Sequence, residues 1–249
     1  MVPGSSPGGP TKEKLHTACS FFIYIYANDP LLKIFNKISF CLLHSQMQKI
    51  KNIIFDLGGV VLDIDFTKTK KAFEALGVAD FDAFFSQYHV SPLFENLETG
   101  KIHPADFYDA FRRETKLSTN DPEIISAWNA MIGEFPKERL DFIQSLSSKY
   151  TVFLLSNTNS IHYDAFINQF LQEHGYDFNS LFSKAYYSHE MNLRKPYAEA
   201  FQYVLEKEQL NPAETLFIDD TKTNTDAASA VGMQVLHLVP PTTIMELGL

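Results

Sequence analysis

The stretch IIFDLGGVV at residues 53–61 decides the fold. An apolar run ends in one acidic residue, Asp56, and a Gly-Gly turn and a second apolar run follow it. A buried strand that delivers a carboxylate to its carboxyl end is typical of ligand sites in α/β sheets. The pattern therefore predicts a core strand at 51–55 and makes Asp56 the candidate nucleophile.

Short apolar runs rich in β-branched and aromatic residues continue along the chain and alternate with helical patterns. Such alternation predicts βαβ units, that is, an α/β fold with a doubly wound, parallel, Rossmann-like sheet. After the first strand, the predicted strands are 151–156, 184–188, 215–219 and 233–238. The predicted helices lie around 136–148, 160–174, 196–208 and 223–231.

One long gap breaks this rhythm, because about 90 residues separate the first strand from the second. Their pattern predicts helices throughout, and proline or a capping residue opens several of them. We therefore expect a helical cap at 66–148, inserted into a catalytic core that is made of 49–65 and 149–249.

Residues 1–48 differ from the rest and begin with the Gly/Pro/Ser-rich run MVPGSSPGGP, which has no means of packing. A short apolar block follows Lys12 and Lys14, as in a signal peptide, but no small-residue cleavage site is evident. We interpret this segment as a disordered or spurious extension. A targeting segment and a genuine structural element remain as alternatives.

Composition excludes several classes of protein. The net charge of −9 argues against a nucleic-acid-binding surface. No stretch of 18 or more clean apolar residues predicts a membrane-spanning helix. Both cysteines, Cys19 and Cys41, precede the first core strand, so the core has no disulfide framework. A small-molecule substrate and a cytoplasmic location fit this composition, and the oligomeric state is left open.

Polar residues follow four of the predicted strands. Because the carboxyl ends of parallel strands meet at one edge of a sheet, these residues should converge there. They supply a carboxylate, a hydroxyl, an ammonium group and an acidic pair, which are the parts of metal-assisted phosphoryl transfer. They are Asp56, Ser156 to Asn159, Arg194 with Lys195, and Asp219 with Asp220 and Asn224.

In order and spacing, the motifs DLGGVVLDIDF, LLSNTN, RKPYAEAF and FIDDTKTN make the chain similar to the haloacid dehalogenase-like hydrolases across roughly 49–240. They most resemble the sugar-phosphatase branch, which includes bacterial α-D-glucose-1-phosphate phosphatases and carries a helical cap after the first strand.

The resemblance implies a role for each matching residue. Asp56 attacks phosphorus and forms an aspartyl-phosphate. Ser156 and the Asn157 backbone amide bind phosphoryl oxygens, and Lys195 neutralises charge beside Asp56. The implied Mg²⁺ ligands are Asp56, the Gly58 carbonyl, Asp220 and, directly or through water, Asp219, with Asn224 orienting the acidic loop.

Gly58 departs from the family pattern. Most phosphatases of this family have an aspartate two residues after the nucleophile, where it acts as general acid and base, a role typically worth about 10²–10⁴-fold in rate. The glycine keeps its carbonyl but has no proton to transfer. Asp63 and Asp65 lie downstream and are either substitutes or simply polar turn residues.

We therefore predict an Mg²⁺-dependent phosphatase of small phosphorylated metabolites, with sugar phosphates as the expected class. Glu98, Trp128 and Asn159 are the candidate substrate-binding residues, although Trp128 is as well explained by helix packing. The alternatives are a 2-haloacid dehalogenase and a catalytically weakened regulatory or binding homologue. The adjacent carboxylates Asp219 and Asp220 argue against a metal-free dehalogenase.

Overall fold

A computed structural model describes residues 50–86, 89–247 and 249, so the predictions for residues 1–48 lie outside it. A sheet of five parallel strands forms the centre of the described chain, in the order β5-β4-β1-β6-β7. The predicted strands are thus confirmed, and β1 occupies the centre. The strands are β1 (Asn52–Phe55), β4 (Thr151–Ser156), β5 (Lys184–Tyr187), β6 (Thr215–Asp219) and β7 (Gln234–His237).

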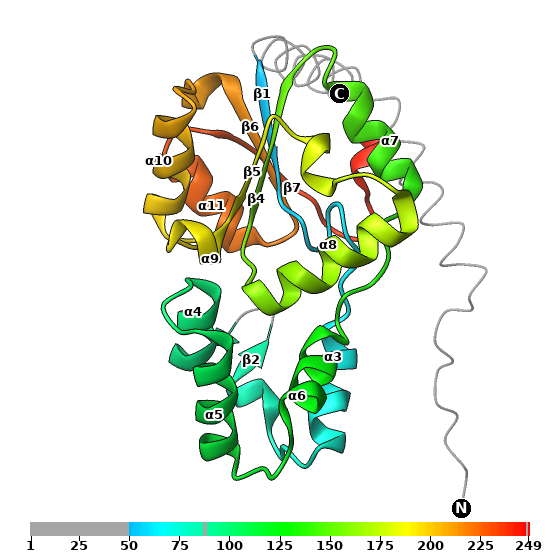
Figure 1. Ribbon diagram of the computed structural model, residues 1–249. Coiled ribbons are helices and arrows are strands. Elements are labelled where there is room, and N and C mark those ends of the chain that lie inside the picture. Colours follow the sequence, from blue (N-terminus) through cyan, green and yellow to red (C-terminus); the bar gives the residue numbers. More distant parts are fainter. Residues whose placement is uncertain (1–49, 87–88, 248) are drawn as a thin grey trace, which may run out of the picture. The chain divides into compact units, whose positions relative to one another are not determined.

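Helices cover both faces of this sheet (Figure 1). Alternate strand residues point to opposite faces, so Ile53 and Phe55 join one apolar cluster while Ile54 joins another. The first cluster includes side chains of α7 (Lys137–Leu146) and α8 (Ser160–His174). The second includes α10 (Ala198–Lys207) and α11 (Lys222–Ala230). This arrangement confirms the doubly wound α/β fold.

Four of the helices between β1 and β4 supply most of a third apolar cluster, and we call residues 66–130 the helical module (Figure 1). Aromatic rings dominate its interior: Trp128 is fully buried, with its ring centroid 4.9 Å from that of Phe94 and 4.7 Å from that of Phe85. The helices are α3 (Phe66–Ala75), α4 (Pro92–Glu98), α5 (Pro104–Thr115) and α6 (Asp121–Asn129).

Capping residues set where these helices begin. The Asn120 side chain accepts from the Glu123 amide at 2.9 Å, and the Glu123 carboxylate accepts from the Asn120 amide at 3.0 Å. Asp65 accepts from the Thr67 amide at 2.9 Å and starts α3. These side chains satisfy amide groups that have no partner within the helix.

The prediction of helices throughout this region is wrong in one place. A short 3₁₀ turn at Phe81–Ala83 leads into an antiparallel pair of two-residue strands, β2 (Phe85–Ser86) and β3 (His89–Val90). The run of aromatic residues there packs Phe85 onto Trp128, and this tertiary contact overrides the helical pattern.

Two neighbouring chain segments connect the helical module to the sheet. The amide of Asp65 donates to the Met131 carbonyl at 2.9 Å, the Gly133 amide to the Asp63 carbonyl at 2.9 Å, and the Asp63 amide to the Glu134 carbonyl at 3.0 Å. We call residues 63–65 and 131–134 the paired linkers. The predicted boundary at 148 is therefore too late, because Leu140, Ile143 and Leu146 of α7 pack with the sheet.

Among the described residues, no helix has both the length and the hydropathy needed to cross a bilayer.

Candidate active site

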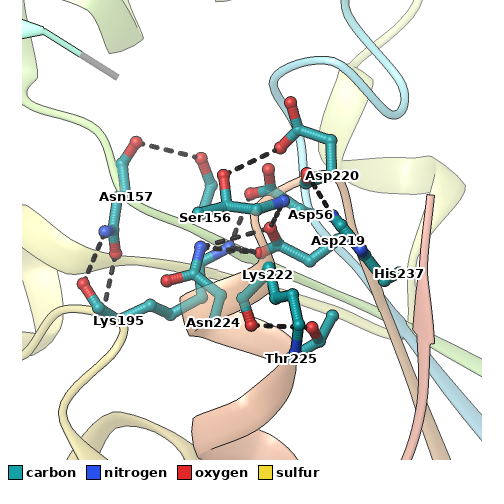
Figure 2. Close-up of polar contacts among 11 residues, drawn as sticks. Asp56, Ser156, Asn157, Lys195, Asp219, Asp220, Lys222, Asn224, Thr225 and His237 are labelled. Atoms are coloured by element: carbon teal, nitrogen blue, oxygen red, sulfur yellow. Dashed lines mark hydrogen bonds and ion pairs between the residues drawn. The ribbon is translucent and has the colours of Figure 1, made fainter. Parts of the chain in front are cut away.

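The residues predicted to meet at the strand ends do meet there (Figure 2). Asp56 follows β1, Ser156 ends β4, Asp219 ends β6, and Lys195 follows the turn after α9 (Ser188–Met191). All four side chains are almost completely buried, with Asp56 the most exposed at 8%. The parallel sheet thus gathers groups that are up to 163 residues apart in sequence.

Lys195 lies at the centre of this group. Its Nζ is 2.7 Å from Asp56 Oδ1 and 2.7 Å from Asp219 Oδ2. Burial disfavours the ammonium, but the charges of Asp219 and Asp56 outweigh it and raise the pKa of Lys195. Lys195 is therefore a permanent cation beside the candidate nucleophile.

Asn157 fixes the backbone that carries this lysine. Its Nδ2 donates to the Lys195 carbonyl at 2.8 Å, and its Oδ1 accepts from the Lys195 amide at 2.9 Å. The side chain of Asn157 thus acts on Lys195, which sequence reasoning did not foresee. Both residues, like Ser156, line the cavity described below.

Asp219 is enclosed by hydrogen-bond donors. It is fully buried and accepts from Lys195, from the Thr221 amide at 2.7 Å, and from Asn224 Nδ2 at 3.2 and 3.0 Å to its two oxygens. Asn224 therefore holds the acidic loop, as predicted from the motif. Asp219 itself is not among the cavity-lining residues, whereas Asp220 is.

Three carboxylates form a potential cation site. Asp56, Asp219 and Asp220 each offer an oxygen, and these oxygens lie within 4.8 Å of one another. Burial raises the pKa of Asp56 to about 7; Lys195 lowers it, and the charges of Asp219 and Asp220 raise it. Burial and Asp219 also raise the pKa of Asp220.

This donor set fits Mg²⁺. Three carboxylates face one ammonium, so the cluster carries uncompensated negative charge, and all the offered ligand atoms are oxygens, as a hard cation prefers. Gly59 lies directly against this cluster. Its φ is +74°, and a Cβ built on it would lie 2.5 Å from Asp220 Oδ2, so only glycine fits at this position.

Neither Asp63 nor Asp65, the two acids considered from the sequence, stands in for the side chain that Gly58 lacks. Asp63 pairs with Arg139 at 2.8 Å, and Asp65 caps α3, so both are turn residues in the structure. His162 lines the cavity, but its Nε2 lies 3.1 Å from the Trp128 carbonyl and its Nδ1 lies 3.3 Å from Asn159 Nδ2. Burial lowers the pKa of His162 to about 4, so it is neutral at pH 7.

A cavity of about 690 Å³ opens onto these groups and extends to the helical module. Glu98, one of the candidate substrate-binding residues, lines this cavity. Its carboxylate forms an ion pair of 3.0 Å with Arg194, which was not predicted. Sequence reasoning placed Arg194 with Lys195 at the strand ends but gave it no role in the site, although its position directly before Lys195 in the RKP motif was a usable signal. It also missed the apolar wall of Ile64, Phe66, Phe85, Val90, Met131 and Ile132.

Two predicted substrate-binding residues lie elsewhere. Trp128 is fully buried, stacks on His162 with centroids 4.5 Å apart, and does not line the cavity. Asn159 is fully buried and caps α8 by accepting from the amides of Ile161 and His162 at 3.1 Å each. Their positions do not support substrate contact, because packing and capping use these side chains.

Comparisons with known proteins agree with the fold. The model of the haloacid dehalogenase-like hydrolase family matches residues 50–232. The chain therefore belongs to the haloacid dehalogenase-like hydrolases, which confirms the resemblance inferred from the motifs.

Similar individual proteins carry phosphatase names. A D-ribitol-5-phosphate phosphatase of Bacteroides thetaiotaomicron is 34% identical over 192 residues, which are 76% of this chain and 91% of that protein. A sesquiterpene phosphatase of Aspergillus oryzae is 30% identical over 201 residues, which are 79% of this chain and 94% of that protein.

A solved structure of similar shape contains ligands. It is a variant of a haloacid dehalogenase family enzyme of Bacteroides thetaiotaomicron in complex with magnesium and inorganic phosphate. Its TM-score is 0.76 at 32% identity, over 80% of this chain and 98% of that one.

Proposed function

We propose that this protein hydrolyses small phosphate monoesters, with sugar and sugar-alcohol phosphates as the substrate class, through an aspartyl-phosphate on Asp56. The chain is a phosphoric monoester hydrolase that uses Mg²⁺. The observation that carries the mechanism is the position of Asp56, whose carboxylate lies 2.7 Å from Lys195 at the floor of the cavity. The name of the relative from Bacteroides thetaiotaomicron supports the substrate class.

The reaction takes two steps at one carboxylate. An oxygen of Asp56 forms a bond to phosphorus while the ester P–O bond breaks, and the leaving oxygen departs with a proton from solvent. Water then attacks phosphorus, which releases inorganic phosphate and restores Asp56. Lys195 keeps its charge beside both the carboxylate and the phosphoryl group throughout.

Each neighbouring group has a share in this scheme. Ser156 and the Asn157 amide bind phosphoryl oxygens, and Asn157 also holds Lys195. Asp56, the Gly58 carbonyl and Asp220 would hold Mg²⁺, with Asp219 acting through water because protein donors occupy both of its oxygens. Bound Mg²⁺ supplies positive charge that offsets the repulsion between carboxylate and phosphate.

The proposal is tested by phosphate release from sugar, sugar-alcohol and aryl phosphates, with Mg²⁺ or with EDTA. We expect turnover with Mg²⁺, none with EDTA, and none for Asp56→Asn, because the nearly isosteric amide cannot form an acyl phosphate. Asp220→Ala should mimic EDTA. Asp63→Asn is the matched control, since that exposed carboxylate pairs with Arg139 outside the cavity.

Two results would contradict the proposal. Near wild-type turnover of a folded Asp56→Asn protein would remove Asp56 as the nucleophile. Chloride release from a 2-haloacid in EDTA would favour the dehalogenase alternative, against which the carboxylate cluster of Asp56, Asp219 and Asp220 argues.

A further inference from the structure

The cavity wall opposite the strand ends is mostly apolar. Of the nine lining residues between 64 and 132, six are apolar, one is Ser86, and two are the glutamates Glu95 and Glu98 of α4. The carbon skeleton of a bound ester can pack on this wall. Polar recognition on the module side must then come from Ser86 and these two glutamates.

Glu98 is paired across the cavity with a residue of the sheet domain. Its Oε2 lies 3.0 Å from Arg194 Nε, and the side chains of Glu98 and Arg194 are 7% and 13% exposed. Arg194 directly precedes Lys195, so the pair lies beside the phosphoryl site. Burial raises the pKa of Glu98, while the charges of Arg194 and Lys195 oppose that shift.

This pair retains hydrogen-bonding capacity. Glu98 Oε2 and Arg194 Nε attract each other without hydrogen-bond geometry, and both atoms are buried. Apart from the contact with each other, the Glu98 carboxylate and the terminal nitrogens of Arg194 take part in no hydrogen bond among the described residues. Buried charges normally have their remaining hydrogen bonds satisfied, which points to a ligand that satisfies them.

A hydroxyl group matches such a pair. Its proton can be donated to the carboxylate while its oxygen accepts from the guanidinium. A second anion would be repelled by Glu98, and an apolar group would leave the remaining hydrogen-bonding capacity of both charges unused. The pair therefore favours neutral, hydroxyl-bearing organic groups.

We propose that Glu98 and Arg194 bind hydroxyl groups of the substrate and thereby select phosphate monoesters of polyhydroxylated carbon chains over monoesters that lack hydroxyls. The proposal rests on the proposed phosphatase function and names the residues that choose its substrate. Glu98 and Arg194 act here as specificity determinants, and Asp56 remains the residue that reacts.

A structural role for the pair must be distinguished from recognition. The ion pair also joins the helical module to the sheet domain, and a second contact does the same next to it: Asn192 Nδ2 donates to the Thr99 carbonyl at 2.8 Å. Asn192 does not line the cavity and has a φ of 58°, so Asn192→Gly removes this contact without straining the backbone. It is a matched control for loosening the module.

The experiment compares kcat/KM for a pentitol phosphate and for p-nitrophenyl phosphate, which carries no hydroxyl, with Mg²⁺ present. In Glu98→Gln, the ratio of the two values should fall by about tenfold or more, mainly through KM of the pentitol phosphate, because charged hydrogen bonds are worth about 1.5–3 kcal/mol. Arg194→Lys should lower the ratio in the same direction, since lysine lacks the planar fork. Asn192→Gly should leave the ratio unchanged.

The outcomes separate the two proposals. If Glu98→Gln and Asn192→Gly act alike on both esters, the pair only joins the module to the sheet domain, and the specificity proposal is overturned. If the wild type hydrolyses both esters with Mg²⁺ but Glu98→Gln and Arg194→Lys leave the ratio unchanged, the specificity proposal is also overturned, while the proposed phosphatase function stands. If neither ester is hydrolysed, the phosphatase function itself fails.

Discussion

At the scale of single residues, Gly58 lies where the resemblance to the family led us to expect an aspartate. The position has no side chain, and the two acids downstream of it are engaged elsewhere: Asp63 with Arg139, and Asp65 with the start of α3. His162 is neutral at pH 7 because burial lowers its pKa to about 4. The leaving group therefore receives no proton from these three residues.

We accordingly expect hydrolysis to depend strongly on the acidity of the leaving group. Sugar 1-phosphates and aryl phosphates should have a higher kcat than sugar 6-phosphates, and Gly58→Asp should speed the poor leaving groups most. Backbone strain does not oppose the new side chain, because Gly58 does not have a positive φ, but Ile64 must shift by a few tenths of an ångström, since a built Cβ lies 3.0 Å from its Cγ1. The measurement is a leaving-group series on both proteins.

A kcat that is the same for all leaving groups would contradict this prediction. If wild-type kcat does not change with leaving-group acidity in single-turnover experiments, another acid donates the proton. Single-turnover conditions are needed because slow product release would also hide the dependence.

At the scale of elements, the strands and the helices of the sheet domain were predictable from sequence. Each strand that ends at a site residue is an apolar run bounded by polar residues, as in TLFID at Thr215–Asp219. The segments between these strands have the hydrophobic periodicity of helices. Convergence of Asp56, Lys195 and Asp219 follows from parallel topology alone. Hydrophobic periodicity and sheet topology together therefore determine the catalytic side of the cavity.

The residues of the helical module that line the cavity could not be predicted from the sequence in the same way. Trp128 and Phe85 are aromatic residues whose sequence pattern does not say which of them faces the cavity, and the structure buries the first and exposes the second to it. The antiparallel pairing of β2 with β3 and the pairing of Glu98 with Arg194 depend on tertiary contacts. Such contacts carry no local signal.

The paired linkers give a prediction at this scale. A Cβ on Gly133 would lie 2.7 Å from the Asp63 carbonyl oxygen, so Gly133→Ala must push the two linkers apart. We expect a loss of about 1–3 kcal/mol in the free energy of unfolding and a lower kcat/KM, because the linkers carry the apolar wall residues Ile64 and Met131. Denaturant unfolding and steady-state kinetics measure the two effects.

Gly175→Ala is the matched control for this substitution. Gly175 ends α8 with a φ of +78°, and a built Cβ has nothing within 4 Å, so alanine there costs about 1–2 kcal/mol through backbone strain alone. It should leave kcat/KM unchanged. Unchanged kinetics in Gly133→Ala as well would mean that the linkers do not position the cavity wall.

At the scale of the whole molecule, charge ties metal binding to stability. The chain carries a net charge of −9, and its active site adds a local excess of carboxylates over Lys195. Burial raises the pKa of Asp56 from 3.8 to about 7, so the folded, metal-free protein retains a proton that the unfolded chain releases near pH 4. The stability contributed by that proton is fully present below about pH 4 and is lost as the pH rises through about 7.

Mg²⁺ should therefore stabilise the protein more at pH 8 than at pH 6. At pH 6 the cation must displace the proton from Asp56, whereas at pH 8 it meets an ionised carboxylate, so affinity and the Mg²⁺-induced rise in Tm should both increase with pH. Thermal unfolding with Mg²⁺ or EDTA at the two pH values measures the rise. Asp56→Asn should reduce its pH dependence and Asp63→Asn should preserve it, whereas an equal rise at both pH values in the wild type would show that Asp56 does not exchange a proton for the metal.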